Sequence, residues 1–78
     1  MRARVPTLII SFANVTEALA VETHCRAAGL PGRIIPVPWE VTAGCGLAWK
    51  AAPEDRDVLL AALVEANLRY EGSYILEL

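Results

Sequence analysis

Charge is scarce in this chain, and its scarcity excludes two classes of partner. Only 21% of the 78 residues are charged, and seven Lys and Arg against nine Asp and Glu leave a net charge of −2. The sequence contains no basic run that could neutralise several phosphates or lie on an anionic lipid surface. We therefore expect no nucleic-acid partner and no membrane partner.

Long apolar runs are also missing, because no stretch approaches the ~20 apolar residues of a membrane-spanning helix. The N-terminal segment does carry some features of a secretory signal: two arginines precede an apolar run at 8–12, and Ala-Leu-Ala at 18–20 resembles a cleavage site. Pro6, Glu17 and the shortness of the apolar run argue against this reading. Cleavage would also remove a predicted strand, so we expect a cytoplasmic protein.

Metal-ligating residues are few and badly spaced for a metal centre. The two cysteines, at positions 25 and 45, form neither a Cys-x-x-Cys pair nor a zinc pattern, and His24 is the lone histidine. A single possible disulfide is also far from the cystine framework of a small secreted domain. We expect reduced thiols, no metal and no cofactor.

What the chain does contain is enough apolar material to fold. Hydrophobic residues make up 55% of the composition, which is too apolar for a disordered chain. A length of 78 residues suits one compact domain and is too short for two. We therefore expect a single domain over residues 1–78.

Strand and helix signals alternate along this domain. β-branched and aromatic residues predict strands, and a 3.6-residue apolar period between capping residues predicts helices. We take Thr16 as the cap of the first helix, with Gly29 following its last turn, and we expect a bulge or a bend at Gly72. The predicted strands are 7–13, 33–37, 47–51 and 70–78, and the predicted helices are 16–28 and 53–68.

The apolar faces of the two helices should meet the sheet. In the first helix the apolar face comprises Ala18, Val21, Cys25 and Ala28. In the second helix it comprises Val58, Leu59, Ala62, Leu63 and Ala66.

This β-α-β-β-α-β order is typical of a ferredoxin-like α+β fold, in which two helices cover one face of a four-stranded antiparallel sheet. With strands numbered along the chain, we expect the order 4-1-3-2. Pro36 has no N–H to donate and therefore places the second strand at an edge. The other face of the sheet should be uncovered.

Cys45 is the residue whose setting best fits chemistry. Gly44 and Gly46 allow positive φ angles, leave the sulfur open, and let backbone N–H groups point at an anion. Such dipoles, or a nearby Arg33 or Lys50, would lower the pKa of the thiol and raise its reactivity. The alternative is a small apolar residue that fills a gap beside the third strand.

Other candidate residues have simpler explanations. Cys25 lies on the apolar stripe of the first helix, where core packing accounts for it. Trp39 and Trp49 could form an aromatic platform for a partner, or they could cover a thin core.

Segment 36–48 carries a family signature. It contains a proline in a strand at Pro36, a Pro-x-Glu segment at Pro38 and Glu40, and a Cys-Gly-Leu-Ala turn at 45–48; Tyr-Glu-Gly follows at 70–72. With these motifs the chain resembles the small bacterial family named putative selenium/sulfur carrier-like proteins. It departs from the family pattern at Trp39, where a basic or polar residue is expected, and in the Ala-Gly before the cysteine, where serines are common.

The resemblance implies a carrier mechanism. A Cys45 thiolate would attack the terminal sulfur or selenium of a persulfide on a donor such as a cysteine desulfurase, and would hold that atom until a second protein collects it. Such exchange needs an accessible thiol and no cofactor. Gly44, Gly46, Arg33, Glu40 and Trp39 are the residues that we expect to support or bind at this site.

Two alternatives remain open. The first is a regulatory or ligand-binding module that uses the uncovered sheet face, for instance to form a homodimer, with Cys45 only a turn residue. The second is a soft-metal carrier that uses Cys45 with Cys25, although metallochaperones of this fold generally offer two closely spaced cysteines.

Overall fold

The predicted succession of strands and helices is confirmed. A computed structural model describes residues 4–39, 41 and 46–78. The elements in chain order are β1 (Pro6–Ser11), α1 (Val15–Ala28), β2 (Arg33–Pro36), β3 (Leu47–Ala51), the short 3₁₀-helix η1 (Pro53–Asp55), α2 (Arg56–Glu65) and β4 (Gly72–Glu77). In the described part of the chain, neither helix has the length and apolarity needed to cross a bilayer.

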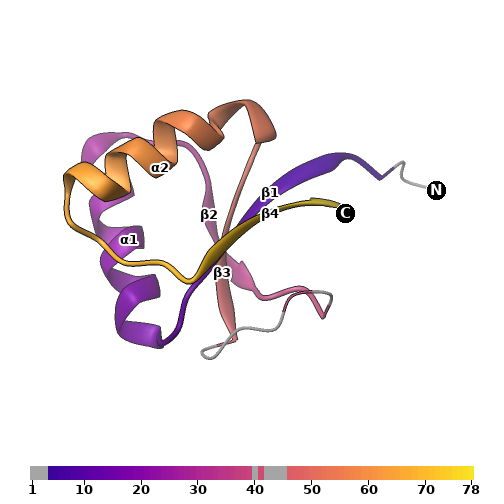
Figure 1. Ribbon diagram of the computed structural model, residues 1–78, viewed down its shortest axis with the longest axis horizontal. Coiled ribbons are helices and arrows are strands. Elements are labelled where there is room, and N and C mark those ends of the chain that lie inside the picture. Colours follow the sequence, from indigo (N-terminus) through magenta and orange to yellow (C-terminus); the bar gives the residue numbers. More distant parts are fainter. Residues whose placement is uncertain (1–3, 40, 42–45) are drawn as a thin grey trace.

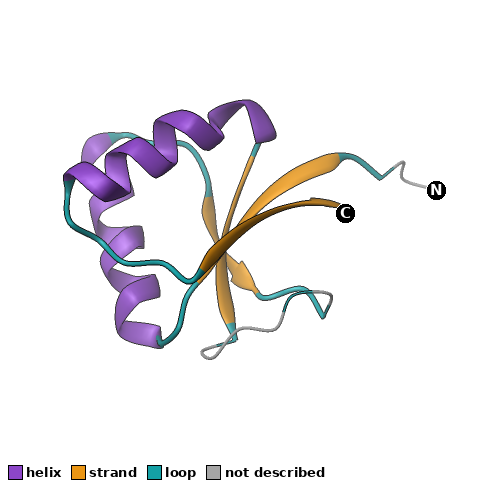
Figure 2. Cartoon of the chain, in the orientation of Figure 1, coloured by secondary structure: helices purple, strands orange, loops and turns teal. Residues whose placement is uncertain are grey.

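The four strands form one antiparallel sheet in the order β2-β3-β1-β4. This is the predicted order 4-1-3-2 read from the other edge. β1 and β3 are central, and β2 with its Pro36 lies at an edge, where the missing N–H costs no ladder hydrogen bond. Both helices lie on one side of the sheet (Figure 1) and pack across it in a separate layer (Figure 2).

The start of α1 differs from the prediction by its capping residue. Asn14, not Thr16, is the N-cap: its Oδ1 accepts a hydrogen bond from the Glu17 amide at 2.9 Å. The Glu17 carboxylate in turn accepts one from the Ala13 amide at 2.9 Å, which resembles a capping box. At the other end the helix stops at Gly29, in the left-handed conformation (φ 69°), as predicted.

Four expectations about packing and local structure were wrong. Ala28 is exposed because α1 ends there, and Val58 is 56% exposed because α2 directs Leu59 and Leu63 at the sheet instead. α2 itself is shorter than predicted at both ends, since its first turn is the separate η1 and the helix stops at Glu65 instead of residue 68. Gly72 makes no bulge: β1 and β4 pair without interruption from Pro6–Glu77 to Ser11–Gly72.

The main core lies between the helices and the sheet. Trp49 is its largest buried side chain, and the indole Nε1 donates a hydrogen bond to the Pro31 carbonyl oxygen at 3.1 Å. This bond satisfies the one polar atom of the ring. The other buried members are Leu8, Ile10, Phe12, Ala18, Val21, Cys25, Ala51, Leu59 and Leu63.

The second face of the sheet is not bare, contrary to expectation. Ile9 and Ala48 are fully buried on it, and Val41 packs against them with only 6% of its surface exposed. Val41 belongs to the connection between β2 and β3, whose described part lies on the side away from the helices (Figure 1). The connection thus covers part of the sheet face that the helices leave open.

Candidate functional site

The candidate site is the connection between β2 and β3, and its described residues define how the chain enters and leaves it. Three of the predicted site residues, Glu40, Gly44 and Cys45, lie outside the described residues. Trp39, Gly46 and Arg33 are described. The structure therefore describes the frame of the site, that is, the β2–β3 hairpin and the residues that lead into and out of the segment containing Cys45.

The frame begins as a regular hairpin. β2 and β3 pair in register from Arg33–Lys50 to Pro36–Leu47, and the Val37 amide extends the ladder with a 2.9 Å hydrogen bond to the Gly46 carbonyl oxygen. Gly46, the residue after Cys45, is exposed and has φ 75°. Gly46 thus adopts the positive φ that glycine allows. The preference for glycine here comes from the backbone conformation alone, since an added Cβ would meet no atom within 4 Å.

A turn follows on the β2 side of the connection. The Val41 amide donates to the Pro38 carbonyl oxygen at 3.0 Å, and burial of Val41 fixes this turn against the sheet. Trp39, inside the turn, is 91% exposed. The two tryptophans therefore differ in role. Trp39 faces solvent in the connection that contains Cys45 (residues 37–46, the cysteine segment), and Trp49 fills the core.

The two cations considered as partners of the thiol lie elsewhere on the hairpin. Arg33 and Lys50 face each other at the opposite end of the β2–β3 pair from Pro36 and Leu47. The two ends are three residue steps apart along the strand, or about 10 Å at ~3.3 Å per residue. Neither cation thus lies at the end of the hairpin where the chain reaches Gly46.

Cys25 has the opposite environment from that expected of a carrier thiol. It is fully buried in α1 among the main-core side chains, as the apolar stripe predicted. Burial raises the pKa of the Cys25 thiol because the thiolate loses its hydration. This sulfur is neither accessible nor easily ionised.

The described ranges 4–39, 41 and 46–78 contain no ligand set for a metal centre. Across these residues no three His, Cys, Asp or Glu side chains are grouped closely enough to hold an ion. Glu54, Asp55 and Asp57 occupy the first turns of η1 and α2, where a helix dipole stabilises acidic residues.

Val41 and Gly32 are two positions that the sequence reasoning missed. A single valine in a loop is a weak signal, because isolated apolar residues are common on surfaces. The role of Gly32 depends on the Trp49 indole, which reaches it from a distant part of the sequence. Neither position could be recognised before the sheet was assembled.

The fold and the frame define a class of protein: a small ferredoxin-like α+β domain with a single cysteine in the connection between an edge strand and a central strand. The sequence profile of the family described as "Putative Se/S carrier protein-like" matches residues 7–75, and the chain therefore belongs to this family. The match runs from β1 into β4 and includes the whole cysteine segment. A comparison with curated proteins and one with solved structures gave no match.

Proposed function

We propose that this protein is a sulfur or selenium carrier that holds the transferred atom on Cys45 as a persulfide or selenopersulfide. Membership of the carrier family over residues 7–75 is the observation that carries the proposal. The matched segment includes the Cys-Gly-Leu-Ala run at 45–48.

The transfer needs no external oxidant or reductant. The Cys45 thiolate attacks the outer sulfur or selenium of the donor's persulfide; a new bond to the Cys45 sulfur forms, the donor's bond breaks, and the donor leaves as a thiolate. A nucleophile on the acceptor then attacks the same outer atom, and Cys45 leaves as a thiolate. In each step one zero-valent atom moves: the protein that gives it returns from the persulfide to the thiolate level, the protein that receives it is oxidised by the same amount, and no net redox change occurs.

The environment of the other cysteine, Cys25, supports the choice of Cys45. The chain has two cysteines, and Cys25 is excluded by complete burial and by a raised pKa. A transferable atom must be reached by two partner proteins in turn, so a buried sulfur cannot carry it. Gly44 and Gly46 would leave the Cys45 sulfur free of neighbouring side chains.

Trp39 supports a docking role next to this thiol. Tryptophan is enriched among the residues that dominate binding energy at protein interfaces, and a side chain that is 91% exposed contributes little to the fold. We assign Trp39 to contact with the donor protein. Glu40 remains assigned to the same contact surface.

Mass spectrometry after incubation with a cysteine desulfurase and cysteine tests the proposal. Wild type and Cys25→Ala should each gain the mass of sulfur, and Cys45→Ala should gain none. Trp39→Ala should be labelled at least several-fold more slowly at low donor concentration and should reach the same final mass. Circular dichroism of each variant checks that the fold is retained.

Two results would contradict the proposal. Equal labelling of Cys45→Ala and wild type would show that Cys45 is not the acceptor. No labelling of folded wild type, either by the desulfurase or by a small-molecule persulfide, would show that the protein does not accept sulfane sulfur. If Trp39→Ala is labelled at the wild-type rate, the docking role alone is wrong.

A further inference from the structure

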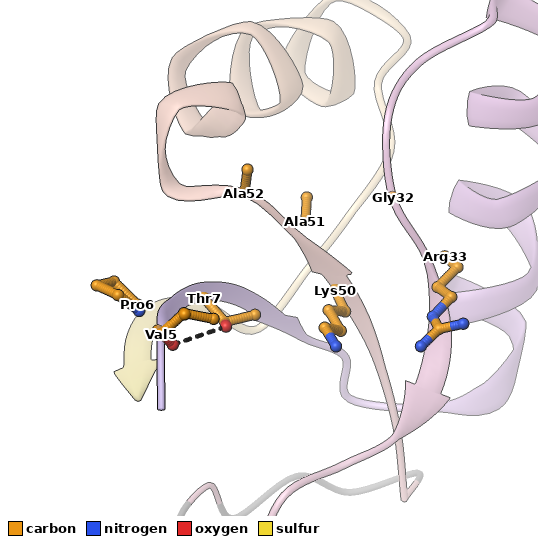
Figure 3. Close-up of a pocket in the computed structure, with 8 residues that line it drawn as sticks. All are labelled: Val5, Pro6, Thr7, Gly32, Arg33, Lys50, Ala51 and Ala52. Carbon is orange, nitrogen blue, oxygen red and sulfur yellow. Dashed lines mark hydrogen bonds between the residues drawn. The ribbon is translucent and has the colours of Figure 1, made fainter. Parts of the chain in front are cut away.

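A groove of about 520 Å³ lies at the end of the sheet farthest from Gly46 along the β2–β3 hairpin (Figure 3). β1 and β3 pair as far as Leu8 and Ala51, after which Ala52 leads into η1. The start of β1 continues beside β4 alone. The start of β1 and the segment that follows β3 therefore separate. The space between these two segments, together with the start of β2, forms the groove.

Two positive charges, on Arg33 and Lys50, lie at the groove. Arg33 on β2 and Lys50 on β3 are directly opposite each other in the register, and Figure 3 shows both side chains on the same side of the sheet. Like charges in opposed positions destabilise a sheet. Within the described residues neither has a carboxylate partner, and the ion pair that is present joins Arg26 to Glu22 on α1.

Among the described residues, the rest of the lining is mainly apolar and includes no acidic side chain. Val5, Pro6, Ala51 and Ala52 supply the apolar surface. The Thr7 hydroxyl, which also borders the groove, is hydrogen-bonded to the Val5 carbonyl oxygen at 3.0 Å. A ligand in this groove would therefore meet two cations on one side and small hydrophobic side chains on the other.

We infer that this groove binds a small organic anion, a carboxylate or a phosphate ester with a short apolar body. A guanidinium offers a planar pair of donors that matches either group, and an adjacent ammonium adds a point charge. The apolar lining would take the remainder of the ligand. Two cations are too few for a nucleic-acid backbone, whose binding requires a longer track of basic residues.

This site is separate from the carrier chemistry. It lies on the same hairpin as the cysteine segment but at the other end, and it uses neither cysteine. The binding experiment below is independent of sulfur transfer, so the two proposals can fail separately.

Titration of ¹⁵N-labelled protein followed by NMR tests the site. Benzoate and phenyl phosphate serve as organic anions, benzamide as the neutral counterpart of benzoate, and inorganic phosphate as the anion without an apolar body. We expect saturable shifts of the amides at 32–33 and 50–52 with at least one organic anion. Benzamide should give none there, and inorganic phosphate should bind more weakly.

Charge-removing variants provide the decisive comparison. Arg33→Gln and Lys50→Gln should each weaken binding of the organic anion at least fivefold. Arg26→Gln removes a cation whose side chain is 78% exposed on α1, and it should bind as wild type does. Lys50 is the lone lysine of the chain, so the signal of its side chain can be followed directly.

Any of four results would overturn the inference. The first is the absence of saturable shifts with both organic anions, and the second is equal binding of benzamide and benzoate. The third is wild-type affinity in Arg33→Gln and Lys50→Gln. If inorganic phosphate binds as tightly as phenyl phosphate, the apolar lining has no part in recognition and the assignment to an organic anion is wrong.

Discussion

Gly32 is constrained twice, by its own backbone and by a side chain from another strand. Its φ of 115° is rarely adopted by residues with a Cβ. A Cβ at this position would also collide with the Trp49 indole and with the Lys50 carbonyl oxygen. Because Trp49 is held by its hydrogen bond to Pro31, the ring cannot move aside without losing that bond.

Substitution of Gly32 should therefore cost more than substitution of another glycine with positive φ. We expect Gly32→Ala to lower the free energy of unfolding by about 3 kcal/mol, as backbone strain and overpacking add. Gly29→Ala should cost about 1 kcal/mol, since Gly29 has φ 69° but open space around it. Urea denaturation measures both, and equal losses would show that the collision is relieved by local movement.

Among the elements, α1 shows how a helix start is chosen between neighbouring candidates. Asn14 and Thr16 are both good capping residues by type. Asn14 accepts the Glu17 amide and Glu17 accepts the Ala13 amide, so two amides that the helix itself leaves free are satisfied. Thr16 lies inside the helix and is exposed.

The cap assignment can be checked with two substitutions of the same kind. Asn14→Ala should lower the free energy of unfolding by about 1 kcal/mol because one capping acceptor is lost. Thr16→Ala should change it by less than about 0.5 kcal/mol, since alanine is a better helix former and no cap is lost. Thermal or urea unfolding of both variants is the measurement, and a larger loss for Thr16→Ala would restore Thr16 as the cap.

For the molecule as a whole, the decisive feature is how the second sheet face is covered. Two helices cover one face of the sheet, and Val41 with Val37 contributes to covering Ile9 and Ala48 on the other. An exposed apolar patch is what favours association through a sheet face. Because this face is partly covered, the structure gives less support to the alternative function as a module that associates through it.

Removal of this cover should expose the face. Val41→Ser should lower the free energy of unfolding by about 2 kcal/mol, since it loses buried apolar contacts and buries a hydroxyl. It should also increase binding of a hydrophobic dye and self-association in sedimentation. Val64→Ser on α2, where the side chain is 70% exposed, is the matched control and should change stability by less than about 0.5 kcal/mol. Equal behaviour of the two variants would contradict a covering role for Val41.

Local chemistry was sufficient to predict much of this protein. Apolar periodicity and capping residues located the strands and helices, Pro36 placed β2 at an edge, and the apolar stripe of α1 placed Cys25 in the core. The motifs around Cys45 identified the family. These features depend on interactions within a few residues or on the residue type itself.

Features that depend on contacts between distant residues required the assembled sheet. Unlike the Asn14 cap, which depends on hydrogen bonds within four residues, the cover of the second face by Val41 arises because the β2–β3 connection lies on that face. Trp39 and Trp49 look alike in sequence, yet one is exposed and the other buried: Trp49 lies in β3 and packs in the core, whereas Trp39 lies outside the strands, in the turn after β2. The pairing of Arg33 with Lys50 also depends on the assembled sheet: a register joins residues that are far apart in the chain, and a shift by one residue would send each side chain to the opposite face.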